Sequence, residues 1–393
     1  YPYPSMYSDH CLQAYAEFNA FNNLLKKLNT IDNITKISAG GYHNLYIREN
    51  DNTFWAWGNN GAGQLGNGNT INLNIPTQIN TDYVSIAATA SHSLGLKSDG
   101  TLWAWGYNSF GQLGDGTTIT RSTPVLVGNS FKSVWAGGFH SFGVKSDNTL
   151  WAWGRNDNGE IGDGTTIDRH LPVNVGSDYT YIAAGESHTL AIKSDGSLWA
   201  WGYNCNGQLG DGTTIDRHTP LQIGTGYATI AARWYHSLGV KVDGTLWAWG
   251  SNEYGRLGDG TETERHAPVF IGNNYTNIAA GAEYSLALKS DGSLWSWGNN
   301  YFGQLGDGTN INRIVPTQIG TGYNHVKAGY YHSLGIKYDN TIWTWGRNNS
   351  GQLGDGTTTD RFTPNRIYLS ELPTLNANIS SSLDLGIDED NIT

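Results

Sequence analysis

Residues 188–202 read HTLAIKSDGSLWAWG, and this stretch decides the fold because it recurs along the whole chain. Its W-x-W-G element begins at seven positions that are 48 residues apart, namely Trp55, Trp103, Trp151, Trp199, Trp247, Trp295 and Trp343. A proline follows each copy at the same spacing, from Pro76 to Pro364. Self-similarity at one fixed period is typical of repeat architectures, in which each copy forms one supersecondary unit. The sequence therefore predicts seven equivalent units.

Each copy is expected to form four short antiparallel strands. In the fourth copy, residues 182–184 are small and apolar, and residues 188–193 alternate between apolar and polar side chains. The Asp-Gly pair at 195–196 is a two-residue hairpin signal, since such turns need a positive φ. Residues 197–201 are the third expected strand and residues 220–223 the fourth. The proline that opens the fourth strand suits the outer edge of a sheet, where a missing N–H donor matters little.

Seven four-stranded units could stack as a solenoid or close into a ring. The near-constant period, the 52 glycines and the 16 tryptophans favour radial blades that close on themselves. Closure also leaves only short, protected strand edges. We therefore predict an all-β chain in which residues 35–370 form a seven-bladed β-propeller of four-stranded antiparallel blades.

The two ends of the chain fall outside the repeats. Residues 1–34 carry apolar side chains at helical spacing after a Ser8-Asp9 N-cap signal, which predicts an N-terminal α-helix that braces the ring or binds a partner. Residues 371–393 are polar and acidic, which is typical of a linker or of a tail that leads to a further domain. The chain begins with Tyr1 instead of Met, so we expect a mature form or an excised piece.

The composition argues against several functional classes. A formal net charge of −11 with 23 Lys plus Arg does not favour nucleic acid as a partner. No apolar run approaches the roughly 18 residues of a membrane-spanning helix. The two cysteines, Cys11 and Cys205, have nothing in the sequence that pairs them. No nucleophile elbow, phosphate-binding loop or zinc signature is present, so we expect no enzyme activity, no cofactor and no metal.

Residues that recur in every copy are expected to be structural. The two tryptophans of each copy point to one sheet face and should pack between neighbouring blades. Aspartates in the D-G-T loops should accept hydrogen bonds from their own loop, because one carboxylate per loop falls short of a calcium ligand set. The Asp-Arg pairs at 168–169, 216–217 and 360–361 suggest loop salt bridges. A histidine precedes the tryptophans in six copies, with Tyr284 in its place in the other, and we expect a ring of buried, hydrogen-bonded imidazoles.

This order of motifs resembles the regulator of chromosome condensation repeat family. The resemblance rests on x-x-H-S, D-G-x-L-W-x-W-G, N-x-x-G-Q-L-G and the later proline, and it covers about residues 35–370. It implies a seven-bladed propeller that binds proteins across one face of the ring. Members of the family include a nuclear exchange factor for a small GTPase, ubiquitin-ligase and scaffold proteins, and a secreted bacterial β-lactamase inhibitory protein. The fold does not choose among these functions.

Candidate functional residues are those that differ between the copies. If strand direction alternates, the first and third connections of every blade share one face of the ring, and these connections hold the variable residues. Tyr, Trp, Phe and Arg there are the types enriched at protein interfaces, with ordinary packing around the glycine loops as the alternative. The candidates are Tyr42, Tyr107, Phe110, Phe139, Arg155, Tyr203, Trp234, Tyr235, Tyr254, Glu283, Tyr301, Phe302, Tyr330, Tyr331 and Arg347. The resemblance to the bacterial inhibitor implies partner contacts for Phe139, Trp234, Tyr235, Tyr330 and Tyr331 in particular.

Two further departures lie in the first strand of their copies. Trp135 and Lys327 carry bulk where most copies have a small residue. Alternation along the strand turns this position toward the central channel. We expect the two side chains to fill the channel in part, with a small-ligand site at the channel mouth as the alternative.

Taken together, these patterns favour a non-enzymatic protein-binding propeller that presents an aromatic loop face to a protein partner. We expect a monomer or one part of a larger chain. Loops rich in Asn and Thr with little Lys suggest a secreted or cell-surface bacterial protein, and a cytoplasmic location is the alternative. Two other functions stay open: nucleotide exchange on a small GTPase, and a glycan-binding or spacer module of a bacterial surface protein.

Overall fold

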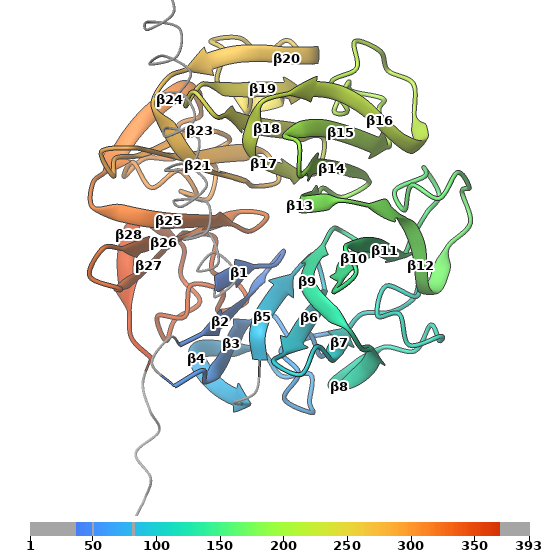
Figure 1. The fold of residues 1–393 in the computed structure, drawn as a ribbon. Helices are drawn as coiled ribbons and strands as arrows, with labels where there is room; N and C mark the ends of the chain where they lie inside the picture. Colours follow the sequence, from blue (N-terminus) through green and yellow to red (C-terminus); the bar gives the residue numbers. More distant parts are fainter. Residues whose placement is uncertain (1–36, 49–50, 81–82, 370–393) are drawn as a thin grey trace, which may run out of the picture.

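The strands of the protein form seven sheets arranged around a central axis (Figure 1). The computed structural model describes residues 37–48, 51–80 and 83–369. In this part of the chain, each sheet consists of four antiparallel strands that are consecutive in sequence. The predicted all-β, seven-bladed propeller is therefore confirmed. The expected N-terminal helix and the tail at 371–393 lie outside the described residues, and no α-helix occurs within them.

We number the blades 1 to 7 in chain order and describe their strands from the axis outward. The inner strands are β1 (Ile37–Ala39), β5 (Tyr83–Ala88), β9 (Phe131–Ala136), β13 (Tyr179–Ala184), β17 (Tyr227–Arg233), β21 (Tyr275–Ala280) and β25 (Tyr323–Ala328). The second strands are β2 (His43–Ile47), β6 (His92–Lys97), β10 (His140–Lys145), β14 (His188–Lys193), β18 (His236–Lys241), β22 (Tyr284–Lys289) and β26 (His332–Lys337).

The other two strands of each blade complete the sheet. The third strands are β3 (Phe54–Gly58), β7 (Leu102–Gly106), β11 (Thr149–Gly154), β15 (Ser197–Gly202), β19 (Leu246–Gly250), β23 (Leu294–Gly298) and β27 (Ile342–Gly346). The outer strands are β4 (Leu73–Asn80), β8 (Arg121–Gly128), β12 (Arg169–Ser177), β16 (Arg217–Thr225), β20 (Arg265–Gly272), β24 (Arg313–Gly320) and β28 (Arg361–Ile367). One short 3₁₀ turn, η2 (Glu253–Gly255), lies in the loop between β19 and β20.

The inner and outer strands are longer than the sequence patterns suggested. In blade 4, β13 begins at Tyr179 and β16 extends over residues 217–225. The ladder between the third strand and the outer strand shifts register twice, between Leu198 and Trp199 and between Ala200 and Gly202. Such bulges break the strict alternation of side chains. The inner ladder shifts register in the same way, between Tyr179 and Tyr181. A pattern-based prediction therefore begins both strands too late and ends the outer strand too early.

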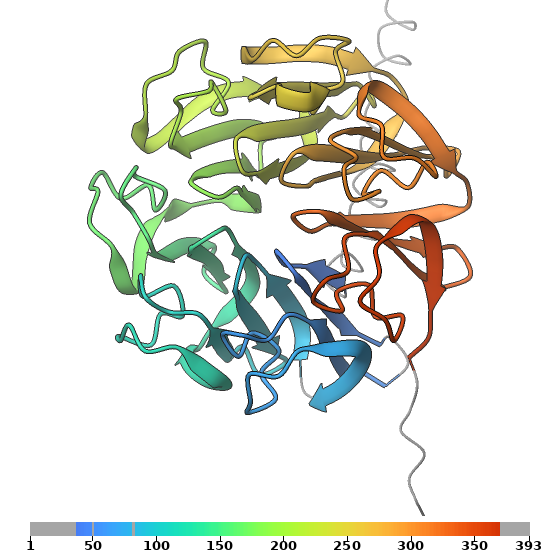
Figure 2. The ribbon, with the colours of Figure 1, turned by 180° about the vertical axis from the view of Figure 1, so that it is seen from behind.

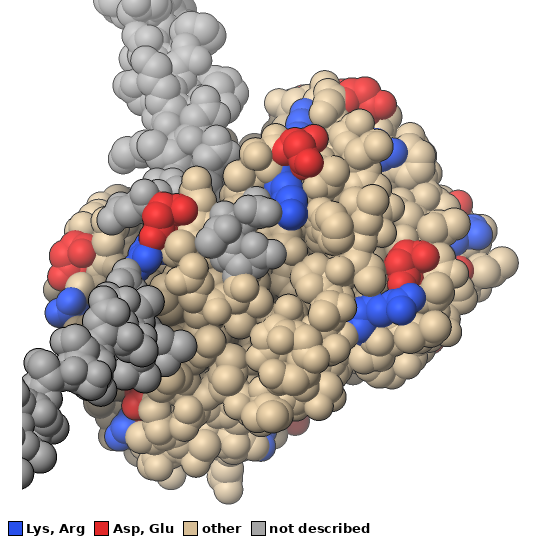
Figure 3. Space-filling model, turned by 90° about the horizontal axis from the view of Figure 1, so that it is seen from below, with Lys and Arg blue, Asp and Glu red and all other residues tan. Residues whose placement is uncertain are grey.

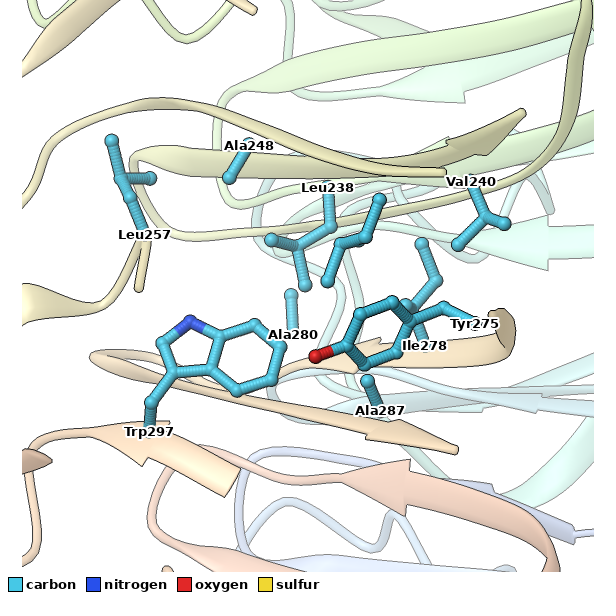
Figure 4. Close-up of a cluster of buried hydrophobic side chains, with 10 residues drawn as sticks. Leu238, Val240, Ala248, Leu257, Tyr275, Ile278, Ala280, Ala287 and Trp297 are labelled. Atoms are coloured by element: carbon cyan, nitrogen blue, oxygen red, sulfur yellow. The ribbon is translucent and has the colours of Figure 1, made fainter. Parts of the chain in front are cut away.

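The hydrophobic core lies between the blades. Figure 4 shows Leu238 and Val240 of blade 5 facing Tyr275 and Trp297 of blade 6. The second tryptophan of the W-x-W-G element is fully buried, and in blade 6 the Trp297 Nε1 donates to the Arg256 carbonyl oxygen of blade 5 at 2.9 Å. The indole ring is pressed onto the preceding blade's loop at Gly258, where a Cβ would lie 2.7 Å from Trp297 Nε1 and where φ is +81°. Glycine there permits both the turn and the close approach.

The first tryptophan of the element is only partly buried in blades 2 to 7, whereas Trp55 of blade 1 is buried. In blade 4, the Trp199 Nε1 donates to the Ser197 hydroxyl at 2.8 Å. The Lys193 ammonium lies 4.6 Å from the Trp199 ring centroid and 4.7 Å from that of Tyr179. Equivalent lysines stand over the same tryptophan in blades 2 to 7. The cation and the ring quadrupole attract each other, so the lysine covers the face of the ring.

The D-G-T loops close on themselves, but through different charge pairs from those suggested by the sequence. Arg169, Arg217 and Arg361 pair with the aspartates six residues upstream (Asp163, Asp211 and Asp355), so the expected pairing with the adjacent aspartate is wrong. The adjacent aspartate accepts a backbone N–H instead, as Asp168 does from Asn156 at 2.8 Å. Figure 3 shows one side of the molecule, where charged side chains are sparse and blue atoms mostly lie next to red ones.

The histidines link each blade to the next. The His188 Nε2 lies 2.9 Å from the Ser237 hydroxyl, which itself donates to the Gln208 carbonyl oxygen at 2.8 Å. Because the hydroxyl hydrogen is used in this way, the imidazole Nε2 is the donor to serine. The same contact between an imidazole Nε2 and a hydroxyl joins blade 1 with blade 2, blade 2 with blade 3, blade 3 with blade 4, and blade 5 with blade 6. The six imidazoles are buried and hydrogen-bonded as expected.

Closure of the ring uses the same contacts at the junction of blades 7 and 1. The His332 Nε2 donates to the Asn44 Oδ1 at 2.8 Å, and the Asn44 amide donates to the Gln352 carbonyl oxygen at 2.7 Å. The Trp57 Nε1 donates to that same oxygen at 3.0 Å. Blade 1 and blade 7 each take their described strands from one repeat, so no sheet is shared across the junction. Side-chain contacts and backbone hydrogen bonds, such as Tyr330 N to Gly41 O and Gly356 N to Asn74 O, hold the ring shut.

Candidate functional site

The variable connections of the seven blades lie on one face of the ring, which we call the loop face. It is formed by the turn between inner and second strands and by the loop between third and outer strands. The turns are joined by backbone hydrogen bonds, from Gly41 N to Thr89 O at 2.6 Å and from Tyr330 N to Gly41 O at 3.1 Å. The side chains on these turns are therefore presented from a rigid frame. Figure 2 shows the molecule from the side opposite to that of Figure 1.

Most candidate residues form one connected set of rings. We call this set the central aromatic cluster and define it as Tyr42, Tyr203, Trp234, Tyr235, Tyr301, Phe302, Tyr330, Tyr331 and Arg347. Neighbouring rings have centroids 4.8–6.2 Å apart, within the range of edge-to-face contacts. Tyr301 is 69% exposed and Tyr235 is 38% exposed, while the other members are half-buried. The cluster takes residues from blades 4 to 7 and from blade 1.

Trp234 holds this cluster together. It lies in the turn between β17 and β18 of blade 5 with a φ of 43°, which non-glycine residues rarely adopt. Its ring contacts Tyr330 at 5.7 Å and Tyr331 at 6.2 Å between centroids, both in blade 7. Strained residues of this kind persist only where their surroundings fix them, and they concentrate at functional sites.

Arg347 of blade 7 packs against three rings of the cluster, which come from blades 1, 6 and 7. Its guanidinium carbon lies 4.6 Å from the Phe302 ring centroid, 5.4 Å from that of Tyr42 and 5.9 Å from that of Tyr331. Its Nη1 also donates to the Tyr42 hydroxyl at 3.3 Å. Arginine stacked on several rings loses little rotamer freedom when a partner binds, which suits a recognition surface.

Tyr330 of blade 7 contacts a partly buried carboxylate, Glu186, in blade 4 across the ring. Its hydroxyl donates to both oxygens of Glu186, at 2.9 and 3.0 Å. Burial raises the pKa of Glu186, and the nearby Arg233 guanidinium opposes part of that rise. Burial and Glu186 together raise the pKa of Tyr330 well above its ordinary value. The neutral phenol thus stays a donor to the carboxylate.

A second, smaller group of candidates lies on blades 2 and 3. The Phe110 and Phe139 ring centroids are 5.4 Å apart, and Tyr107 lies 6.3 Å from Phe110 and 6.0 Å from Phe139. Arg155 lies 5.6 Å from the Phe110 centroid and pairs with Asp157 at 2.9 Å. No ring contact among the described residues joins this group to the central aromatic cluster.

The remaining loop-face candidates, Tyr254 and Glu283, line a cavity of about 520 Å³ beside the cluster. The cavity is bounded by Tyr301, Tyr331 and Arg347 as well. Burial raises the pKa of Glu283, and Asn299 Nδ2 donates to its Oε2 at 3.2 Å. The wall of this cavity therefore combines aromatic surface with one acid and one base.

Trp135 and Lys327, the two candidates on inner strands, both line a cavity on the ring axis. Its volume is about 270 Å³, and all seven inner strands contribute to its wall. The Trp135 ring packs on Tyr181 with centroids 6.3 Å apart.

The described residues contain no group of His, Cys, Asp and Glu side chains that could hold a metal ion. Within the same residues, no helix is long and apolar enough to cross a membrane. Cys205 is an exposed free thiol.

Two residues of this face, Glu186 and Arg233, are absent from the sequence-derived candidates. The sequence does single out Arg233, because it stands where five of the other copies have glycine (Gly40, Gly137, Gly185, Gly281 and Gly329). Glu186 stands in a variable pair, but its partner Tyr330 is 144 residues away. Only the closed ring brings those two together.

Comparison with known proteins agrees with this geometry. A family model described as an RCC1-like domain matches residues 16–274 and 180–389. Among solved structures, yeast RCC1 (Prp20) bound to Kap60 is similar at 23% identity, covering 81% of this chain and 84% of that one with a TM-score of 0.73. Human WBSCR16 is similar at 21% identity, covering 80% of this chain and 93% of that one with a TM-score of 0.73.

A second structure of Prp20p from Saccharomyces cerevisiae, described with its binding properties to Gsp1p and histones, has 24% identity. It covers 83% of this chain and 88% of that one, with a TM-score of 0.72. At these identities the likeness establishes the fold. No curated protein matches the sequence.

Proposed function

The chain belongs to the RCC1-like domain family, and from this premise we propose that it is a non-enzymatic propeller whose loop face binds a protein partner. Propellers of this family typically bind proteins and are usually not catalytic. The fold leaves the partner open, so the site itself has to carry the proposal.

The observation that carries it is the central aromatic cluster. Its rings run without a break from Tyr203 through Trp234 to Tyr301 across the loop face. A cluster with a half-buried centre and exposed tips resembles a hot spot, in which Trp, Tyr and Arg supply most of the binding energy. Tyr301 and Tyr235 would insert into the partner, while Trp234 and Arg347 hold them in place.

The test compares two tyrosines of similar exposure on opposite faces. Tyr301 is 69% exposed on the loop face, and Tyr338 is 65% exposed in the hairpin between β26 and β27 on the other face. A photo-crosslinking amino acid at 301 first captures the partner. Titration of that partner should then show a loss of about 2 kcal/mol, or roughly 30-fold in Kd, for Tyr301→Ala and for Trp234→Ala.

Tyr338→Ala is the matched control and should bind as the unchanged chain does. Equal affinity of all three variants, or an equal loss in the control, would contradict the proposal. Nucleotide exchange on a small GTPase and glycan binding remain alternatives for the same face. A positive nucleotide-release assay or a glycan-array hit that depends on Tyr301 would replace the proposal.

We also propose that the protein works outside a bacterial cell or on its surface. Support comes from composition alone, namely Asn- and Thr-rich loops with few lysines. Fractionation of the source cells followed by immunodetection tests this. Detection in the cytoplasmic fraction alone would refute it.

A further inference from the structure

The cavity on the ring axis has an unusual charge content. Most of its lining is small and apolar, with alanines of the inner strands such as Ala87, Ala183 and Ala279. The charged residues in its described lining are Arg233 and Lys327, and no carboxylate is among them. Two like charges that face the same axial cavity repel each other unless a counter-charge lies between them.

Lys327 enters this cavity from β25 of blade 7. Four other blades have alanine at its position, so the lysine adds a charge that the fold does not need. It forms no ion pair with any carboxylate of the described residues. Burial lowers the pKa of Lys327 to about 8, and no acidic neighbour opposes that shift. A bound anion would supply the missing counter-charge.

Arg233 enters from the end of β17 in blade 5. Its Nε and Nη2 atoms are buried and have no hydrogen-bond partner. Its guanidinium carbon lies 4.8 Å from the Tyr330 ring centroid. This stacking fixes the plane of the guanidinium but satisfies none of its N–H donors. The nearby acid, Glu186, forms no ion pair with it in the described residues, and both Glu186 oxygens accept from the Tyr330 hydroxyl instead. The Arg233 charge still opposes part of the rise in the pKa of Glu186. Buried donors without a partner cost free energy, so an acceptor is expected there.

Size restricts the class of ligand. Pockets for drug-sized molecules have volumes of about 300–1,000 Å³, and this cavity, at about 270 Å³, is smaller. A guanidinium fork matches the paired oxygens of phosphate, sulfate or a carboxylate, and an ammonium adds a point charge.

We propose that the axial channel binds a small oxyanion of the phosphate or sulfate class between the Arg233 guanidinium and the Lys327 ammonium. The anion is either free or the terminal group of a small metabolite. This site adjoins the loop face, because Arg233 stacks on Tyr330 of the central aromatic cluster. Lys327 is not part of that cluster, so weaker anion binding by Lys327→Ala with unchanged partner binding distinguishes the two proposals.

Calorimetric titration of the full chain with inorganic phosphate, with sulfate and with glycerol phosphate tests the proposal, at constant ionic strength set by chloride. We expect saturable binding of at least one of these anions. Lys327→Ala restores the residue found in four other blades and should keep the fold. It should weaken binding by roughly tenfold to a hundredfold, and Arg233→Gln should do the same.

Lys132→Met is the matched control, since Lys132 is an exposed lysine on the inner strand β9. It should bind the anions as the unchanged chain does. Crystals soaked in selenate should show an anomalous peak between Arg233 and Lys327. Heat signals no larger than those of chloride, or equal affinity of the Lys327→Ala and unchanged chains, would overturn the proposal. Tighter binding of glycerol phosphate than of free phosphate would identify a metabolite as the source.

Discussion

At the scale of single residues, six buried histidines join neighbouring blades through one hydrogen bond each. Burial lowers the pKa of His43, His92, His140, His188 and His332 to about 3, and that of His236 well below its usual value. The neutral imidazole is therefore the form that the fold requires. The histidine pattern was readable in the sequence, whereas the identity of each acceptor was not.

Acid should unfold the protein through these histidines. Their folded pKa lies below the unfolded value of about 6.5. The stability that they give is therefore present above pH 6.5 and is lost as the pH falls toward 3. Each histidine lowers the unfolding free energy by about 1.4 kcal/mol per pH unit in that window, and six together by about 8 kcal/mol per unit. This approaches the whole stability of a typical domain, about 5–15 kcal/mol.

Urea denaturation at a series of pH values between 7 and 4 measures this slope. His188→Tyr copies the arrangement of blade 6, where the Tyr284 hydroxyl lies 2.9 Å from the Ser333 hydroxyl. That variant should take up one proton fewer on unfolding at pH 5. A stability that does not change between pH 7 and 4 would show that the imidazoles are not buried as described.

At the scale of structural elements, the loop between third and outer strands is stabilised by an aspartate and an arginine that occur together. Asp211 accepts from Thr213 N at 3.0 Å and from Asn204 Nδ2 at 3.1 Å, and it pairs with Arg217. Six loops share this arrangement. Blade 1 has Asn67 and Leu73 at the two positions instead. Both partners change together, which points to a coupled pair.

A double-mutant cycle tests that coupling. Asp211→Asn keeps the oxygen that accepts from Thr213 but leaves Arg217 without its acid, and it should cost about 1–3 kcal/mol. The variant that carries both Asp211→Asn and Arg217→Leu reproduces blade 1. It should regain about 1 kcal/mol or more over the aspartate change alone, which chemical denaturation can measure. Simple additivity of the two single effects would refute the coupling.

At the scale of the whole molecule, the described strands hold the ring shut without strand exchange between its first and last blades. Successive blades are linked by the chain, whereas the described residues of blades 7 and 1 are joined by non-covalent contacts. These include the Asn44 hydrogen bonds with His332 and with the Gln352 carbonyl, the backbone bond from Tyr330 N to Gly41 O, and a shared hydrophobic cluster. In a linear array of repeats, the terminal units are the first to unfold. The junction of blades 7 and 1 lacks the chain connection that links the other blades, so we expect it to open first.

Asn44→Ala should open this junction. The change leaves His332 Nε2 buried without an acceptor, at a cost of about 1–3 kcal/mol. Hydrogen exchange should speed up in β1 to β3 and in β25 to β27 before the rest of the ring. The equivalent change Ser237→Ala, between the chain-linked blades 4 and 5, should lower overall stability without such local opening. Asn44→Ser restores the hydroxyl found in other blades and should keep the ring closed.

The sequence by itself determined the number of blades, their four-stranded plan and the structural role of the repeated residues. Each of these depends on local periodicity, and seven copies of one pattern amplify that signal. It also indicated that Trp234, Tyr301 and the other variable residues share a face, because strand direction alternates. Only the tertiary structure decided which of them touch.

Contacts such as Tyr330 with Glu186, Trp234 with Tyr331, or Arg233 facing the cavity of Lys327 join blades far apart in the chain. Their partners are set by ring closure and by the orientation of each turn, and neither leaves a periodic trace in the sequence. The predicted pairing of the loop salt bridges was wrong for a related reason. The bend of the loop brings Arg169 to Asp163 and turns the adjacent Asp168 toward a backbone N–H.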